Sequence, residues 1–237
     1  MLLFILRHGD PIYNPDSLTE RGHLQAEALA KRLALYGIDK IYSSSMIRAQ
    51  QTAHPTEVLL NKKVELADWA REDILHREWS TVHNGIRRWF FHNPEKAMLR
   101  DPSVSALGLE WYKHPLFKDI KGEQEYNRLL QHSDDFLLSH GYRHDRENCR
   151  YIAENHSDER VAMFCHQGFG LSWLGVMLDI PLPIIWSGFD FSHTGMTVVE
   201  FKPDENGIVL PQVLTLSNDS HLYKEGLPTK YNNIIYF

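Results

Sequence analysis

The sequence predicts an α/β fold in which a mostly parallel sheet is covered by helices on both faces, giving a three-layer α/β/α sandwich. Two short apolar runs, at residues 2–6 and 160–165, have the unbroken hydrophobic pattern of strands that are buried on both faces. Each run is followed by a loop and then by a segment with apolar residues at helical spacing. Strands that alternate with helices in this way are typical of parallel sheets.

The elements of the sandwich follow in order along the chain. After the first strand, a capping pattern at residues 17–20 begins a helix that ends at Gly37. Residues 38–42 indicate a second strand, and the serines at 43–45 precede a helix that carries Arg48. Beyond the strand at 160–165, the pattern predicts a helix over 171–178 and further strands at 196–201 and 213–216.

The middle of the chain has a different pattern. Between Asp68 and about His156 lie long, aromatic-rich stretches, including residues 86–91 and 125–130, which we interpret as helices because no strand punctuation separates them. A chain of 237 residues suits one large domain better than two. We therefore predict a single domain, residues 1–237, with a helical cap inserted at about residues 80–150 over the active-site edge of the sheet.

Charge and cysteine content limit the partners and the compartment. The 25 basic and 31 acidic residues give a net charge of −6, so no global basic field would hold a nucleic acid or an anionic membrane. The two cysteines, Cys149 and Cys165, are too few for a disulfide framework, which favours a reducing compartment. The opening apolar run lacks a basic region ahead of it and is interpreted as a strand instead of a signal. We expect a cytoplasmic protein.

The tripeptide Arg7-His8-Gly9, at the end of the first strand, combines three features of a phosphate pocket. Arginine offers a forked, permanent cation, and glycine lets backbone approach an anion closely. A neutral imidazole between them is a competent nucleophile near pH 7. A second histidine, His166, also follows a predicted strand. Because functional loops lie at the carboxyl ends of parallel strands, one sheet edge is expected to bring His8 and His166 together.

Further segments extend this pattern along most of the chain. They are Asn14 and the stretches at 18–26, 42–53, 69–72 and 164–168, with a tail at 218–222. Together with Arg7-His8-Gly9, their order and placement resemble the histidine phosphatase superfamily, also called phosphoglycerate mutase-like. The tail is similar to one found in bacterial members of that family.

The resemblance implies a set of roles. His8 would accept the phosphoryl group, and Arg7, Arg48 and His166 would grip it with cations that replace a metal. Asn14 and the backbone amides around Gln167 would add neutral donors for substrate binding. Glu72 would act as the general acid. Glu78 is the next candidate for that role, and Glu65 is a further nearby carboxylate.

Histidines, a cysteine and aromatic residues outside this set are further candidates for a functional role. The 14 histidines raise the question of a metal site. His140 and His144 have the i, i+4 spacing of two ligands on one helix, but Gly141 lies between them, so we expect neither a metal nor a cofactor. Cys165 ends an apolar run and is expected to be a buried core residue. Aromatic residues of the insertion either wall the substrate or pack the cap onto the core, and packing is favoured. They are Trp89, Phe90, Phe91, Trp111 and Tyr112.

Two departures from the family bear on function. Asp10-Pro11 stands where many members have a Thr or Ser after the first residue, so one hydroxyl contact to phosphate is expected to be missing. Arg87-Arg88 is a candidate for the paired arginines of a glycolytic mutase, although a solvated basic patch fits it as well. We favour a metal-independent phosphatase that acts on a small phosphorylated molecule. Two alternative functions are left open, a phosphoglycerate mutase and an inactive phospho-ligand-binding protein. A homodimer is left open as the oligomeric state.

Overall fold

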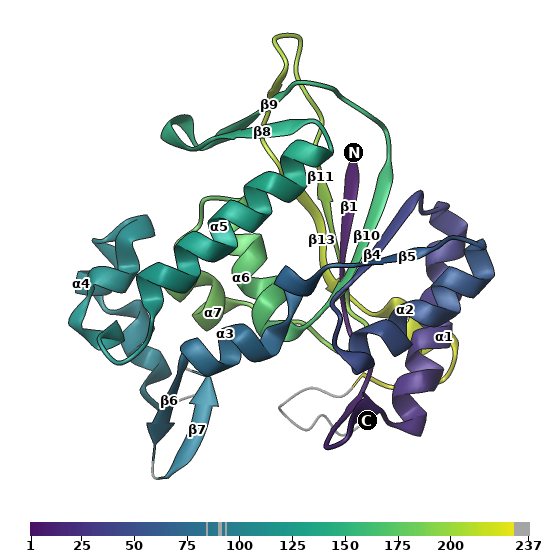
Figure 1. Ribbon diagram of the computed structural model, residues 1–237, viewed down its shortest axis with the longest axis horizontal. Helices are drawn as coiled ribbons and strands as arrows, with labels where there is room; N and C mark the ends of the chain where they lie inside the picture. Colours follow the sequence, from purple (N-terminus) through teal and green to yellow (C-terminus); the bar gives the residue numbers. More distant parts are fainter. Residues whose placement is uncertain (84, 90–91, 93, 230–237) are drawn as a thin grey trace.

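The computed structural model describes residues 1–83, 85–89, 92 and 94–229. Its centre is a six-stranded sheet in the order β13-β11-β1-β10-β4-β5 (Figure 1). The strands are β1 (Leu2–Arg7), β4 (Lys40–Ser43), β5 (Val64–Leu66), β10 (Arg160–Cys165), β11 (Met196–Glu200) and β13 (Gln212–Asn218). The four strands β1, β10, β4 and β5 are parallel to their neighbours in this group, whereas β11 is antiparallel to both β1 and β13. The predicted mostly parallel sheet is confirmed.

Alternate side chains of β1 pack in two separate hydrophobic cores, one on each face of the sheet. Phe4 and Leu6 pack in a cluster with residues of α1 (Glu20–Tyr36) and α2 (Ile47–Leu60). Leu3 and Ile5 belong to the larger cluster that includes α5 (Gly122–Ser139) and α6 (Gln167–Met177). Successive side chains of a strand point to opposite faces, so this division produces the three predicted layers. Figure 1 shows α1 and α2 on one side of the sheet and α5 and α6 on the other.

The insertion between β5 and β10 contains strands as well as helices, and the expectation of helices alone was wrong. Its helical elements are η1 (Asp68–Ala70), α3 (Glu72–Glu78), η3 (Pro94–Arg100), α4 (Pro102–Ser105), η4 (Gly108–Lys113), η5 (Pro115–Phe117), α5 and η6 (Arg146–Asn148). Its strands are β6 (Ser80–His83), β7 (Ile86–Trp89), β8 (Tyr142–Asp145) and β9 (Arg150–Ala153). The predicted helix at residues 125–130 lies inside α5.

Of the segment expected as a helix at residues 86–91, residues 86–89 are instead the second strand of a hairpin. β7 pairs antiparallel with β6, and Gly85 in the connection has a φ of +77°. An Asn-Gly pair between two strands is a strong hairpin signal because both residues tolerate positive φ. The sequence carries that signal as Asn84-Gly85, next to an aromatic-rich stretch. Residues 90 and 91 lie outside the described residues.

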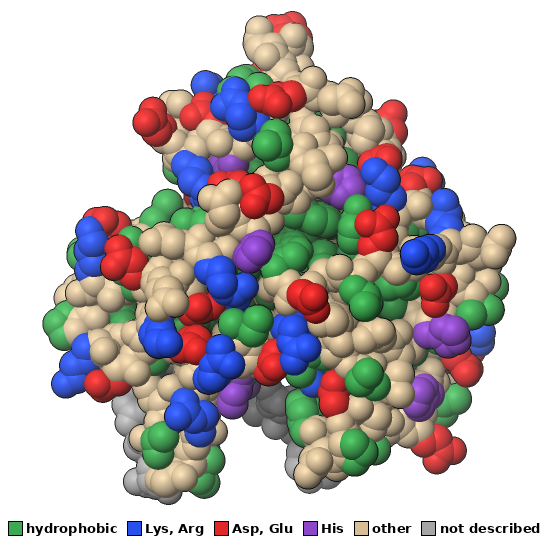
Figure 2. Space-filling model, in the orientation of Figure 1, with side chains coloured by type: hydrophobic (Ala, Val, Ile, Leu, Met, Phe, Trp, Pro, Cys, Tyr) green, Lys and Arg blue, Asp and Glu red, His purple; other side chains and the backbone are tan. Residues whose placement is uncertain are grey.

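Small elements complete the fold. They are the hairpin of β2 (Pro11–Tyr13) and β3 (Asp16–Leu18), the strand β12 (Ile208–Val209), α7 (Leu182–Gly188) and α8 (Ser220–Lys224). β12 pairs with β9, which in turn pairs with β8, to make a separate three-stranded sheet. Charged side chains of both signs are mixed across the face in Figure 2. Within the described part of the chain, no helix has the length and apolar character needed to cross a bilayer.

Candidate active site

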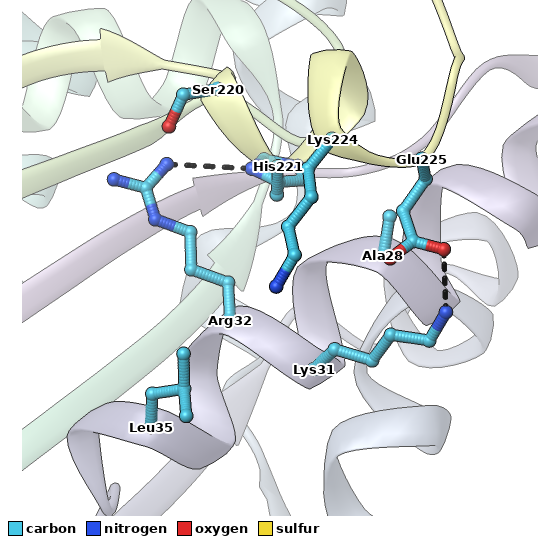
Figure 3. Close-up of a pocket in the computed structure, with 8 residues that line it drawn as sticks. All are labelled: Ala28, Lys31, Arg32, Leu35, Ser220, His221, Lys224 and Glu225. Carbon is cyan, nitrogen blue, oxygen red and sulfur yellow. Dashed lines mark hydrogen bonds and ion pairs between the residues drawn. The ribbon is translucent and has the colours of Figure 1, made fainter.

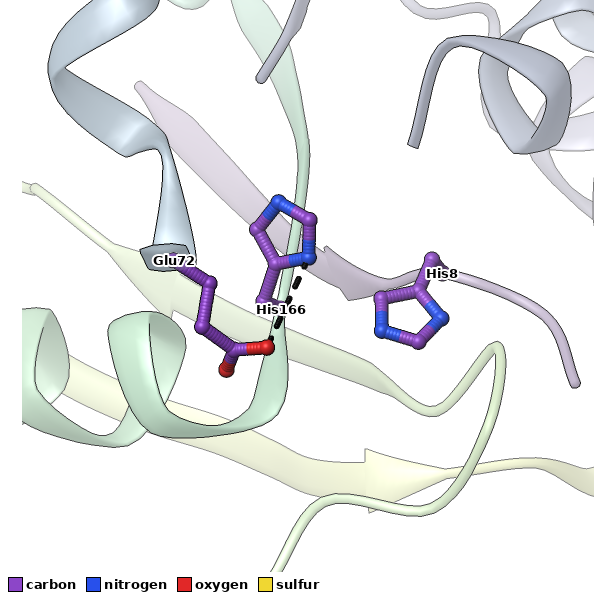
Figure 4. A group of neighbouring side chains, drawn as sticks. All are labelled: His8, Glu72 and His166. Carbon is purple, nitrogen blue, oxygen red and sulfur yellow. Dashed lines mark ion pairs between the residues drawn. The ribbon is translucent and has the colours of Figure 1, made fainter. Parts of the chain in front are cut away.

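The two histidines singled out by the sequence meet at one edge of the sheet. His8 follows β1 and His166 follows β10, and the register of these parallel neighbours places Arg7 opposite Cys165. The backbone N–H of His8 donates to the carbonyl of Cys165 at 2.9 Å. The two imidazole rings are 5.2 Å apart between centroids, and Glu72 lies beside them (Figure 4). The expected meeting of His8 and His166 is confirmed.

Arg48 and Glu72 enter the same site from helices that follow β4 and β5. Arg48 lies in the first turn of α2, and its side chain is only 5 % exposed. One guanidinium nitrogen lies 3.3 Å from Glu72 Oε2, and another donates to Asp16 Oδ1 at 2.7 Å. Glu72 is the first residue of α3, and its Oε1 accepts from the backbone N–H of Gly168 at 2.7 Å. The arginine and the glutamate are therefore held against one another beside the histidines.

The hydrogen bonding of His8 fixes its tautomer. Its Nδ1 lies 2.7 Å from the carbonyl oxygen of Gly9. A carbonyl only accepts, so Nδ1 carries the proton and Nε2 keeps a free lone pair. Burial holds the pKa of His8 well below its usual value, and electrostatic interactions with His166, Arg7 and Arg48 lower it further. At neutral pH the ring is uncharged, which is the state that a nucleophilic imidazole requires.

His166 is buried and neutral for similar reasons. Burial, followed by the charges of Arg48 and Arg7, holds the pKa of His166 well below its usual value. Its Nε2 lies 2.9 Å from the hydroxyl of Ser44, and its Nδ1 lies 3.8 Å from Glu72 Oε2. A dianionic ligand beside the ring would offset these effects and favour its protonated form.

Arg7 is held by the loop between α7 and β11. Its side chain donates to the backbone carbonyl of Phe191, and its Nη2 lies 3.0 Å from Nε2 of His193. Burial lowers the pKa of Arg7, and the charge of Glu72 opposes that effect.

Three buried nitrogen atoms of this group have no hydrogen-bond partner within the described residues. They are Nε of Arg7, Nε of Arg48 and Nδ1 of His166. Buried polar groups in folded proteins are nearly always hydrogen-bonded, so three exceptions in one cluster call for an explanation. Guanidinium nitrogens only donate, and an anion with several oxygens supplies acceptors for them.

A cavity of about 380 Å³ opens beside the cluster. This volume lies at the low end of the range for small-molecule sites. Its lining comprises Arg7, His8, Tyr13, Asp16, Met46, Arg48, Glu72, Asp73, His76, Trp89, His92 and Gln167. Of the aromatic residues in question, Trp89 lines the cavity, whereas Trp111 is fully buried against Trp79 and Trp186. Tyr112 packs against the larger core, and Phe90 and Phe91 lie outside the described residues.

A metal is the alternative ligand for part of this group. His8, Glu72 and His166 offer ligand atoms that all lie within 4.8 Å of one another. Two buried guanidinium groups stand beside them, and Glu72 already accepts from Arg48 and from Gly168. The added positive charge of a divalent cation would be repelled by both arginines, so the group suits an anion better. The expectation of no metal stays a prediction.

The remaining candidate residues are scattered. Asn14 is exposed in the β2–β3 hairpin and is not part of the cavity lining, although Tyr13 and Asp16 on either side are. Gln167 lines the cavity and donates to Asp190. Glu78 faces Arg77 and Lys121 instead, and hydrogen bonds from those two side chains hold its pKa below the usual value.

Other sequence candidates have different surroundings. Arg87 donates to the carbonyl of Arg77, and neither Arg87 nor Arg88 lines the cavity. Cys165 is fully buried, and burial strongly raises the pKa of its thiol, which fits the expected core role. A Cβ at Gly9 would lie 2.6 Å from the carbonyl oxygen of Gly22 in α1. Gly9 is therefore required by packing against α1, a reason that the tripeptide alone did not reveal.

Several residues of the site were missed in the sequence, above all His193. Its ring lies 5.9 Å from that of His8 between centroids. His193 precedes β11, and an antiparallel strand begins at the edge where its parallel neighbours end. Knowing that this strand runs antiparallel would have pointed to the residues before it. Tyr13, Asp16, His76 and His92 had no distinguishing pattern.

Comparisons with known proteins agree with this geometry. Residues 3–106 match the family model "Histidine phosphatase superfamily (branch 1)". The mitochondrial serine/threonine-protein phosphatase Pgam5 of Drosophila melanogaster is 31 % identical over 146 residues, which is 56 % of this chain and 47 % of that protein. Pgam5 of Drosophila erecta is 45 % identical over 146 residues, with the same shares of the two chains. The chain thus spans about half the length of the curated relatives it matches.

Solved structures extend the likeness over nearly the whole chain. A phosphoserine phosphatase from Entamoeba histolytica, in complex with 3-phosphoglyceric acid, has a TM-score of 0.60 and 18 % identity, and the match covers 93 % of this chain and 98 % of that one. A mycobacterial glucosyl-3-phosphoglycerate phosphatase in complex with VO3 has a TM-score of 0.58 and 18 % identity, covering 90 % and 97 %. At such identities the likeness establishes the fold.

Proposed function

We propose, from the match of residues 3–106 to the histidine phosphatase superfamily and from the geometry of the site, that the chain is a metal-independent phosphatase of phosphomonoesters with a phosphohistidine intermediate on His8. The observation that supports this most directly is the buried group of two neutral imidazoles and two arginines, three of whose nitrogens have no hydrogen-bond partner in the described part of the chain. A phosphoryl group with its equatorial oxygens matches those donors in charge and in number.

In the first step, Nε2 of His8 attacks phosphorus, the N–P bond forms and the P–O bond to the leaving group breaks. Arg7, Arg48 and His166 bind the phosphoryl oxygens, where negative charge is concentrated in the transition state. Glu72, in its protonated form, gives its proton to the leaving oxygen. In the second step Glu72 takes a proton from water, the water oxygen attacks phosphorus, and the N–P bond breaks to release phosphate and neutral His8. Gln167 contributes to binding from the cavity wall.

Phosphatase activity is favoured over phosphoglycerate mutase activity by the charges around the cavity. Among the described lining residues, Arg7 and Arg48 are the only arginines and there is no lysine, whereas Asp16, Glu72 and Asp73 are acidic. Once a phosphoryl group occupies the two arginines, a substrate carboxylate would meet no permanent cation. We further propose that the insertion at about residues 80–150 is a cap that selects a small phosphorylated substrate, because Trp89 and His92 line the cavity.

The test is hydrolysis of a chromogenic phosphate ester in the presence of excess chelator. Release that persists under chelation is expected, and loss of activity that added metal restores would overturn the metal-independent mechanism. His8→Ala should abolish turnover, while the matched variant His54→Ala changes an exposed histidine and should retain it. Substantial turnover by His8→Ala would remove His8 as the nucleophile.

The acid is tested with Glu72→Gln against Glu78→Gln. Glu72→Gln should slow hydrolysis of an alkyl phosphate, whose leaving oxygen needs a proton, far more than hydrolysis of a nitrophenyl phosphate. Glu78→Gln should alter neither rate greatly, because Glu78 pairs with Arg77 and Lys121 away from the cavity. The opposite pattern would transfer the acid role to Glu78.

A further inference from the structure

The loop of residues 189–195, between α7 and β11, places the ring of His193 against the guanidinium group of Arg7. Resting on the proposed function, we infer that His193 is a positioning residue, which fixes the Arg7 guanidinium for phosphate binding while Asp10 fixes the orientation of the His193 ring. Neither His193 nor Asp10 has to touch the substrate for this role.

The direction of the hydrogen bond between Arg7 and His193 follows from the donor alone. A guanidinium group only donates, so Nε2 of His193, at 3.0 Å from Nη2 of Arg7, must accept. The ring proton of neutral His193 is then on Nδ1, which lies 3.5 Å from Oδ1 of Asp10. A carboxylate on that side stabilises this tautomer and the ring orientation that goes with it.

Asp10 is itself held in place. Its Oδ2 accepts from the hydroxyl of Thr19 at 2.9 Å, and its backbone N–H donates to Gln25 Oε1 at 2.8 Å. Thr19 is the N-cap of α1, and Gln25 is a buried residue of the same helix. The series from α1 through Asp10 and His193 to Arg7 therefore connects the guanidinium to a rigid element of the fold.

The loop has an uncommon backbone conformation next to His193. Thr194 has a φ of +56°, a region that is rare for a β-branched residue and that persists where surrounding contacts enforce it. Those contacts are present: its backbone N–H donates to the carbonyl of His8 at 3.2 Å, and its fully buried hydroxyl lies 3.0 Å from Nε2 of His221. The turn at Thr194 binds the loop to the histidine proposed as the nucleophile.

The result is a guanidinium that is fixed at two of its three nitrogens. Phe191 accepts from Nη1 and His193 from Nη2, while the buried Nε has no partner within the described residues. Donors that are oriented before the substrate arrives lose little freedom when the phosphoryl group binds. Without His193, the guanidinium of Arg7 would lose the acceptor at Nη2 and would be less firmly oriented.

The experiment compares His193→Phe, which keeps a ring but cannot accept from Arg7, with His193→Gln, whose amide can accept from Arg7 and donate towards Asp10. Binding of inorganic phosphate is measured by calorimetry, and kcat and KM are measured with a chromogenic ester. We expect His193→Phe to lose roughly tenfold in phosphate affinity and at least as much in kcat/KM, as for the loss of a hydrogen bond from a charged donor. His193→Gln should recover most of both losses.

Thermal unfolding of each variant separates positioning from folding, and His193→Ala replaces His193→Phe if the latter does not fold. His54→Phe, at an exposed histidine elsewhere, is the matched control and should bind phosphate like the unchanged protein. Unchanged phosphate affinity in a folded His193→Phe or His193→Ala variant would overturn the inference, as would failure of His193→Gln to recover binding. Because phosphate binding is read without turnover, an unchanged protein that binds phosphate but hydrolyses no ester would refute the proposed function alone.

Discussion

His221 makes the stability of the fold dependent on pH in a way that can be calculated. It lies in α8, is 5 % exposed, and faces Arg32 of α1 across a pocket between the two helices (Figure 3). Burial, then the charge of Arg32, lowers the pKa of His221 to about 4, and Asp219 opposes this shift. In the unfolded chain the same side chain has its usual value of 6.5. His221 therefore binds a proton between these two values only when the protein unfolds.

The sign and size of the effect follow from that difference. As the pH falls below about 6.5, the unfolded state gains protons that the folded state excludes, so the free energy of unfolding decreases until the pH reaches about 4. Between pH 7 and pH 5, the two pKa values give a loss of about 2 kcal/mol from this one group. That is a large fraction of the stability of a typical domain.

The assay is urea unfolding of the unchanged protein and of His221→Gln at pH 7 and at pH 5. Glutamine cannot be protonated in this range, and its amide can still hydrogen-bond with Thr194 and Arg32. Other buried histidines contribute equally to both proteins and cancel in the comparison. The unchanged protein should lose about 2 kcal/mol more than the variant between the two pH values. Equal losses would show that His221 is not held neutral, and the reasoning about its burial would be wrong.

Three further predictions concern the site itself. Gly9→Ala should destabilise the fold by about 1–3 kcal/mol in denaturant unfolding, because its Cβ would meet backbone of Gly22 at 2.6 Å; a neutral change would show that α1 moves aside freely. Cys165→Ala should leave kcat/KM within about twofold, because burial raises the thiol pKa and leaves no thiolate; a large loss would reopen a thiol mechanism. NMR titration of the ligand-free protein should find His8 and His166 uncharged at pH 6, because burial lowers both pKa values; a protonated ring at that pH would contradict the burial described.

The order of strands and helices could be predicted because buried strands produce apolar runs that a single sequence displays. Residues 160–165 match β10, and residues 2–6 lie within β1. The general rule about the carboxyl ends of parallel strands then placed His8 and His166 together. Arg48 and Glu72 were identified from a family resemblance, because a charged residue on a helix does not show in the sequence which way it will face.

The features that escaped prediction depend on contacts between distant segments. The β6–β7 hairpin differs from the expected helix because its strand punctuation is a single two-residue turn, Asn84-Gly85, inside an aromatic-rich stretch. His193 was missed because its role depends on the direction of β11, which neither composition nor hydrophobic periodicity encodes. The reason for Gly9 likewise lies 13 positions away, in the backbone of Gly22. Local patterns specify elements, and only the assembled sheet specifies which side chains become neighbours.

The position of β1 has a consequence for when the candidate site can form during synthesis. Both hydrogen-bonded neighbours of this first strand, β10 and β11, come from beyond residue 159. A growing polypeptide that has already emerged with His8 therefore has no strand to pair with until most of the described chain has left the ribosome, and pairing over such a separation is intrinsically slow. Partial chains that end before β10 should be unable to bring His8 and His166 together, so the proposed phosphate-binding group would form only after β10 has paired with β1.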